Sequence, residues 1–376
     1  MQRIVLTLAL YIFFSFSTFA QKNILDDKEL LPLIKQSLSY IYNTDVVQAN
    51  QVNQKIEQKI PDHPAYFLLK ALTIRAANTP VTHHTPEFED LKNYLQKTYA
   101  EAEKILDKDD MHPEANFFAM ASLGLLAMYE NDEGNHLKAV GLAQEAYTNL
   151  KNGFELKEEY PEFYFSTGLY NYYRIKYPEL HPVYRPFMLF FRSGDKQLGL
   201  EQLKKAHQES IFMGPESADY LTHIYLRYEN RPKEALQYAQ SLAAQYPDNL
   251  YFITNYLDVA ISAKQYYQLD QQLQKLLNSK REYYQMTGNL FKALLLEKKE
   301  QDFSAAKIAY RASLALAKNM DNEEAENYTS YAYAGLARIA NQEKDYDQAR
   351  AMYKKALDNA HYPPMQAEAK AYLDKH

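Results

Sequence analysis

The sequence predicts an all-α protein built from repeated helical hairpins, and two observations support this fold. Gly is sparse, with 10 residues in a chain of 376, while Ala, Leu, Lys, Glu and Gln, which all favour helix, are common. Apolar residues also recur at i, i+3, i+4 and i+7, the pattern of a helix that buries one face. The pattern is clearest from Tyr333, where YAGLARIANQEKDYDQARAMYKKAL divides into two short amphipathic helices.

Related pairs of helices recur upstream of this stretch. Small or apolar residues take equivalent places on the second helix of successive pairs, at intervals of 36, 34, 37 and 43 residues: Gly199, Ala235, Leu269, Ala306 and Ala349. A small residue there lets two helix backbones approach closely. The sequence resembles the tetratricopeptide repeat (TPR) family, whose period is about 34 residues. The resemblance implies a right-handed TPR-like helical-hairpin solenoid.

We expect one continuous TPR-like solenoid over residues 25–376, with seven or eight helix pairs. Regular repeats cover 216–361, and 364–376 form a capping helix, because the last apolar face of a solenoid needs a cover. In the pair at 249–278, the spacing places Tyr266, Leu269, Leu273 and Leu276 on the second helix.

Irregular repeats cover 27–215, and an insertion at 178–194 interrupts them. Its sequence, PELHPVYRPFMLFFRSG, is much longer than a TPR turn requires. Long insertions of this kind are often functional. The alternative is that the FMLFF segment is buried against the array.

Residues 1–20 have the pattern of a secretory signal peptide: one basic residue, Arg3, an apolar run and a small residue, Ala20, before the expected cleavage point. An uncleaved N-terminal anchor is the alternative. We therefore expect an exported protein, periplasmic or associated with the cell surface, with no transmembrane segment after cleavage. The chain has no Cys, which excludes thiol catalysis, Cys-ligated metals and acylation of a cysteine near the signal.

Composition and motifs narrow the function further. The chain has 42 Lys and Arg against 48 Asp and Glu, a net charge of −6, whereas a nucleic-acid binder needs a basic face. The GxSxG, P-loop, GxGxxG and HExxH motifs are absent. The adjacent His83 and His84 lack the spacing of metal ligands. We expect no enzyme activity, cofactor or metal site.

Two groups of residues are candidates for binding a partner. The first surrounds the insertion and combines aromatic rings with guanidinium groups, which suit a peptide, a sugar ring or an anionic group; it contains Tyr172, Tyr173, Arg174, Tyr184 and Arg185. The second follows from the TPR resemblance, which implies a concave groove lined by the first helices. The matching positions are Glu162, Tyr172, Glu216, His223, Arg227, Tyr251, Asp258 and Arg338.

The sequence thus predicts a non-catalytic scaffold that binds a protein or peptide partner in the bacterial cell envelope. The 34 tyrosines would supply flat contact area at low entropic cost. Two alternatives stay open: a glycan-binding protein of an outer-membrane sugar-uptake system, and a helical-toroid hydrolase or lyase. The oligomeric state and the identity of the partner are open as well.

Overall fold

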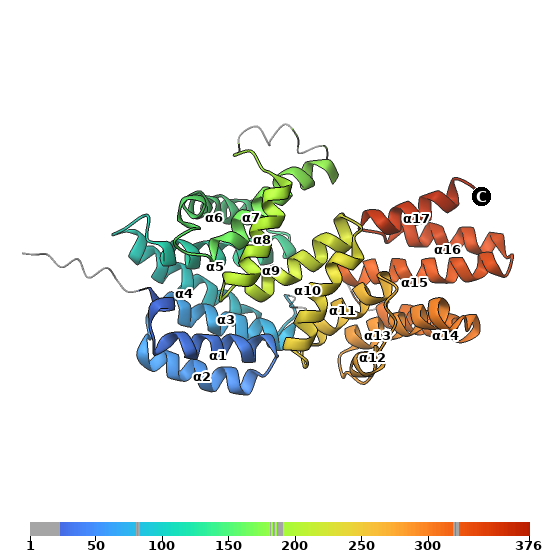
Figure 1. The fold of residues 1–376 in the computed structure, drawn as a ribbon, viewed down its shortest axis with the longest axis horizontal. Helices are drawn as coiled ribbons and strands as arrows, with labels where there is room; N and C mark the ends of the chain where they lie inside the picture. The colour runs from blue at the N-terminus through green and yellow to red at the C-terminus, as the bar shows by residue number, and fades with distance from the viewer. Residues whose placement is uncertain are drawn as a thin grey trace, which may run out of the picture.

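The computed structural model describes residues 23–376 except 80, 82, 181, 183–184, 186–190, 319 and 321–322. The described chain forms eight helical hairpins followed by one further helix, with no strand among these residues (Figure 1). Each helix packs chiefly on its neighbours along the chain. The predicted all-α, TPR-like helical-hairpin solenoid is confirmed. The predicted signal peptide lies outside the described residues.

The first four hairpins are α1 (Leu30–Tyr42) with α2 (Val46–Lys59), α3 (Pro64–Asn78) with α4 (Phe88–Leu106), α5 (Pro113–Asp132) with α6 (His136–Leu156), and α7 (Phe163–Leu180) with α8 (Lys196–Glu209). The other four are α9 (Gly214–His223) with α10 (Pro232–Gln245), α11 (Leu250–Ser262) with α12 (Asp270–Leu277), α13 (Glu282–Leu295) with α14 (Phe303–Ala317), and α15 (Glu323–Gln342) with α16 (Tyr346–Asp358). The last helix is α17 (Pro363–Leu373), and π-helical turns extend α9 as η3 (Ile224–Tyr228) and α13 as η4 (Leu296–Glu300).

The turn inside most hairpins uses one left-handed residue. Positive φ values between 51° and 81° occur at Thr44, Gly134, Asn230, Lys264, Gln301 and Lys344. In four of these turns the next residue donates its N–H to the carbonyl five residues back, as in Asp345 N to Ala340 O at 2.9 Å, which ends the first helix. Asp345 then accepts the Gln348 N–H and begins the second helix.

Two predicted boundaries are wrong. Helix α7 continues through Pro178 to Leu180, so the insertion begins later than predicted. Helix α12 begins only at Asp270, which leaves Tyr266 and Leu269 outside it. The cause is a second left-handed residue, Gln268 with φ 54°, just before this helix.

The five equivalent positions predicted to pack closely are all buried. The closest approach is at Gly199 on α8, where a Cβ would lie 2.6 Å from the Tyr172 backbone nitrogen and 2.7 Å from the Gly168 carbonyl oxygen. Since real Cβ atoms do not come that close, only glycine fits this crossing of α7 and α8.

The solenoid turns so that its N-terminal hairpins meet its middle. The end of α1 lies against α11 (Figure 1). The Tyr42 ring is 5.4 Å from that of Tyr246 and 6.3 Å from that of Phe252, and its hydroxyl donates to the Phe212 carbonyl at 3.0 Å. One apolar core therefore runs from α1 to α11.

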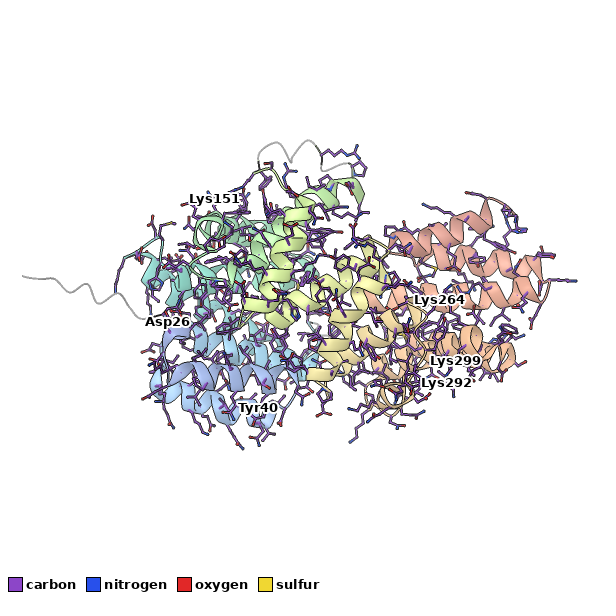
Figure 2. All side chains as sticks on the ribbon, viewed as in Figure 1. Asp26, Tyr40, Lys151, Lys264, Lys292 and Lys299 are labelled. Atoms are coloured by element: carbon purple, nitrogen blue, oxygen red, sulfur yellow. The ribbon has the colours of Figure 1, made fainter. Side chains whose placement is uncertain are left out.

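The surface carries side chains of both charge signs over both halves of the molecule (Figure 2). The labelled Tyr40 lies on the N-terminal hairpins, and Lys264, Lys292 and Lys299 lie around hairpins 6 and 7. Within the part of the chain that the structure describes, none of the helices has the length and apolar character needed to cross a bilayer.

Candidate binding site inside the solenoid

A cavity of about 550 Å³ lies between hairpins 1–3 and hairpins 5–7, and we call it the inner cavity. Its wall comes mainly from the first helices of these hairpins, as the TPR resemblance implies. The tyrosine and ionisable side chains that line it are Tyr42, Arg75, Tyr129, Asp132, Glu216, Asp219, Asp248, Tyr251, Arg281 and Tyr284.

Polar contacts join the two sides of the inner cavity. Arg75 on α3 and Glu216 on α9 form an ion pair, with 2.9 Å between Nη1 and Oε1. Arg281 donates to the Asn78 carbonyl at 3.1 Å. The Tyr284 hydroxyl donates to the carbonyl of Thr79, the residue after Asn78, also at 3.1 Å. The cavity is thus held by contacts between segments that are 141 to 205 positions apart.

The wall formed by α9 and α11 is also fixed by side chains. The Tyr251 hydroxyl donates to Asp219 Oδ2 at 3.2 Å, and Asn255 Nδ2 donates to Asp219 Oδ1 at 2.8 Å. Carboxylates, guanidinium groups and tyrosine rings are therefore presented together from a positioned wall. This chemistry suits a polar, extended ligand with both apolar and hydrogen-bonding parts.

A second, smaller cavity of about 40 Å³ lies next to the first, and we call it the polar pocket. It is lined by Thr222, His223, Leu226, Arg227, Tyr251, Asn255, Asp258, Asn327, Tyr328 and Tyr362. Four residues of the predicted groove, His223, Arg227, Tyr251 and Asp258, come together here. Tyr251 lines both cavities.

Arg227 is the central charge of the polar pocket and is 7% exposed. It forms an ion pair with Asp258 and donates to the Tyr331 hydroxyl at 2.8 Å. Burial lowers the pKa of Arg227, but Asp258 and the neighbouring tyrosine hydroxyls outweigh burial and raise that pKa well above its usual range. The rings of Tyr328, Tyr331 and Tyr362 lie 5.4–5.8 Å from the guanidinium carbon, so this cation is enclosed on several sides.

His223 stays neutral beside this cation. Burial and the charge of Arg227 lower the pKa of His223 to about 3. Its ring lies 5.2 Å from the rings of Tyr228 and Tyr362. Because Tyr362 immediately precedes α17, this aromatic contact joins α17 to hairpin 5.

Six of the predicted residues that the structure describes line neither cavity: Glu162, Tyr172, Tyr173, Arg174, Arg185 and Arg338. Glu162 is buried and accepts backbone N–H bonds from Ile211, Phe212 and Met213 at 2.6–3.2 Å, which fixes the loop before α9. Burial raises the pKa of Glu162 to about 7 although these bonds lower it. Arg338 holds Glu297 with two bonds, at 2.6 and 2.9 Å, and Glu368 with one at 2.7 Å, tying hairpins 7 and 8 to α17.

The residues predicted around the insertion are spread over α7 and the segment after it. Tyr172 is fully buried, and its hydroxyl donates to Glu229 at 2.6 Å. Tyr173 packs 5.2 Å from Tyr172, ring to ring. Arg174 donates to the Arg192 carbonyl at 3.1 Å. Arg185 donates to the Pro178 carbonyl at 3.2 Å, while Tyr184 lies outside the described residues.

Sequence reasoning missed several lining residues, above all Arg75, Asn255, Arg281 and Asn327. The positions of Arg75, Asn255 and Asn327 on first helices were a usable signal, because first helices line the cavities. Arg281 precedes α13 and has no comparable signal, since its role depends on a contact with a distant hairpin. Among the described residues, no group of three or more His, Cys, Asp or Glu side chains is arranged to hold a metal ion.

Comparisons with known proteins add little to this geometry. No family model and no curated protein matches the chain. Among solved structures, yeast Tom70 is similar at 12% identity and a TM-score of 0.34, over 93% of this chain and 89% of that one. A human IFIT1 dimer with PPP-AAAA is similar at 13% identity and a TM-score of 0.37, over 84% and 69% of the two chains. Likenesses this distant carry no functional argument.

Proposed function

We propose that this protein is a non-catalytic scaffold that binds an extended segment of a protein partner in the inner cavity. The observation that carries the proposal is the cavity itself, about 550 Å³ in volume and lined by four tyrosines among charges of both signs. This volume falls within the range of roughly 300–1,000 Å³ that is typical of ligand sites.

The physical basis is a match between the wall and a peptide. Tyrosine rings offer rigid, amphipathic contact area with few rotatable bonds. The neighbouring carboxylates and guanidinium groups can pair with backbone amides and charged side chains, which favours one partner over another. We place this function in the bacterial cell envelope, because residues 1–20 have the pattern of an export signal.

A glycan is the second candidate for the inner cavity. Tyrosine faces stack on sugar rings, and carboxylates accept bonds from sugar hydroxyls, so Tyr251 beside Asp219 would suit such a ligand as well. We favour the peptide because charges of both signs line the wall, and a peptide can offer charged side chains that complement them, whereas a neutral glycan cannot.

The test uses a variant that changes the cavity wall without touching the core. Met128 and Asp132 line the inner cavity and are exposed, so Met128→Lys with Asp132→Lys should fold and alter the wall. Leu137→Lys with Glu159→Lys likewise replaces one apolar and one acidic residue by lysine, at exposed positions outside the cavity, and is the matched control.

Envelope extract would be passed over wild type, the cavity variant and the control. We expect a defined protein that is retained by wild type and control and lost from the cavity variant. A synthetic peptide from that protein should then compete for binding. Saturable binding of an oligosaccharide that is lost only in the cavity variant would overturn the peptide in favour of a glycan. Turnover of a captured ligand that is abolished by the cavity variant would overturn the non-catalytic role.

A further inference from the structure

The polar pocket contains an unsatisfied hydrogen-bonding group. Asn327 on α15 is 2% exposed, and its Oδ1 is one of only three buried side-chain atoms without a hydrogen-bond partner in the described part of the chain. A buried polar atom without a partner costs about 1–3 kcal/mol. Because Asn327 lines the polar pocket, a donor group that reached this atom from the pocket would satisfy it.

The polar pocket is deep at Asn327 and open at its other end. Arg227, Asp258 and Asn327 are buried, whereas Tyr251, Asn255 and Tyr362 are partly exposed. Because Tyr251 also lines the inner cavity, a ligand in that cavity can extend a side chain past Tyr251. The volume of about 40 Å³ exceeds what a single water requires, roughly 10–15 Å³, and admits a group of a few heavy atoms.

The charges of the polar pocket favour a neutral group. Arg227 and Asp258 neutralise each other in a buried ion pair. A cation would lie beside the guanidinium group, and an anion beside the Asp258 carboxylate and the Asn327 oxygen. Either charge would also lose its hydration without gaining an uncommitted partner of opposite sign.

Among neutral groups, a primary carboxamide satisfies the wall best. It has two N–H donors and a carbonyl acceptor, so it can donate to Asn327 Oδ1 and accept from the Asn327 amide in return. A hydroxyl carries its donor and its acceptors on one atom, so it matches the two-atom edge of the Asn327 amide less well than a carboxamide does. The planar carboxamide is also suited to stacking between tyrosine rings, such as those of Tyr328 and Tyr362, which line the pocket.

We propose that the polar pocket binds the carboxamide end of a Gln or Asn side chain from the segment held in the inner cavity. This inference rests on the proposed function and specifies its ligand. Asn327 would select the side chain, and the tyrosines at the mouth would guide it inward.

The experiment uses acetamide as the probe, with methylammonium and acetate as charged probes of similar size. Saturation-transfer NMR on the full-length mature protein gives an apparent affinity for each. We expect saturable binding of acetamide, at least tenfold weaker binding of both charged probes, and a loss of at least tenfold in acetamide affinity in Asn327→Leu. Asn289→Leu, on a partly exposed position of α13, is the matched control and should bind acetamide as wild type does.

Asn327→Ala serves as a second variant if the leucine perturbs folding, which circular dichroism would show. The inference is overturned if either charged probe binds as tightly as acetamide, or if both Asn327 variants keep the wild-type affinity. It is also overturned if acetamide does not saturate and only water fills the pocket in a crystal soaked with the probe. None of these results bears on the proposed function. That function is tested separately, by whether the inner cavity captures a partner and loses it in the Met128 and Asp132 variant.

Discussion

Arg75 and Glu216 form an ion pair across 141 positions of sequence, with 2.9 Å between the guanidinium nitrogen and the carboxylate oxygen. The two side chains come from α3 and α9, on opposite sides of the inner cavity. Their contact therefore does more than stabilise one helix. Together with the bonds of Arg281 and Tyr284, it joins the N-terminal hairpins to the middle of the solenoid across the proposed binding site.

We predict that Arg75→Gln lowers the free energy of unfolding by about 1 kcal/mol, because the two side chains are partly exposed, at 34% and 16%, and solvent screens the pair. A double-mutant cycle with Glu216→Gln should give a coupling of similar size that shrinks at high salt. Denaturant unfolding measures both. Arg231→Gln, which breaks a surface pair with Glu234, is the control and should change stability by less than about 0.5 kcal/mol. Zero coupling in the cycle would show that other contacts join the two sides of the cavity.

The crossing of α7 and α8 leads to a prediction about glycine. Gly199→Ala should destabilise the protein by about 1–3 kcal/mol, because the added methyl meets backbone atoms of α7 that cannot move independently. Gly141→Ala is the matched control, since it lies in α6 with nothing within 4 Å of the new Cβ. It should stabilise the protein by about 0.5–1 kcal/mol through helix propensity alone. Thermal unfolding of the two variants tests this prediction. Shifts of the same sign in their melting temperatures would contradict the close crossing of α7 and α8 at Gly199.

The sequence was sufficient to predict the hairpins because their cause is local. The recurrence of small residues such as Gly199, Ala306 and Ala349 reflects contacts between neighbouring helices, and all three are buried where the period places them. The shortening of α12 escaped prediction because the left-handed conformation of Lys264 and Gln268 has no strong local signature in those residue types.

The candidate site was predictable only in part, for a related reason. His223, Arg227, Tyr251 and Asp258 lie on first helices and could be placed on one face by spacing. Their meeting in a single pocket depends on how successive hairpins stack, which their spacing does not specify. The contribution of Asn327 depends further on α15 meeting η3, where Arg227 donates to Tyr331. The contact of Arg75 with Glu216 depends on how hairpins distant in sequence are brought together.

The left-handed residues in the turns predict a substitution that stabilises the protein, whereas most substitutions destabilise it. Lys344 has a φ of 66°, a conformation that costs a residue with a Cβ roughly 1–2 kcal/mol. We expect Lys344→Gly to raise the free energy of unfolding by about 0.5–1 kcal/mol, since part of this gain is offset by the greater entropy of glycine in the unfolded chain. Lys354→Gly, at an exposed position within α16, should instead lower it by about 1 kcal/mol. Denaturant unfolding measures both effects. Equal losses of stability in the two variants would contradict the left-handed conformation of Lys344.

Glu162 predicts how stability depends on pH. Burial raises the pKa of its carboxyl from the ordinary value of 4.5 to about 7 in the folded protein. Between about pH 4.5 and 7 the folded state therefore keeps a proton that the unfolded chain releases. The free energy of unfolding falls as pH rises through this window, by an amount on the order of 3 kcal/mol for a shift of this size.

Glu162→Gln removes the titrating group while keeping an oxygen that can accept from the loop before α9. We expect the loss of stability from pH 5 to pH 8, measured by denaturant unfolding at each pH, to be smaller in this variant than in wild type by about that amount. Glu159→Gln, three residues earlier and exposed, should leave the wild-type pH dependence unchanged. If wild type and Glu162→Gln lose stability in parallel, the backbone N–H bonds from Ile211, Phe212 and Met213 outweigh burial, and the carboxylate is ionised in the folded protein throughout this range.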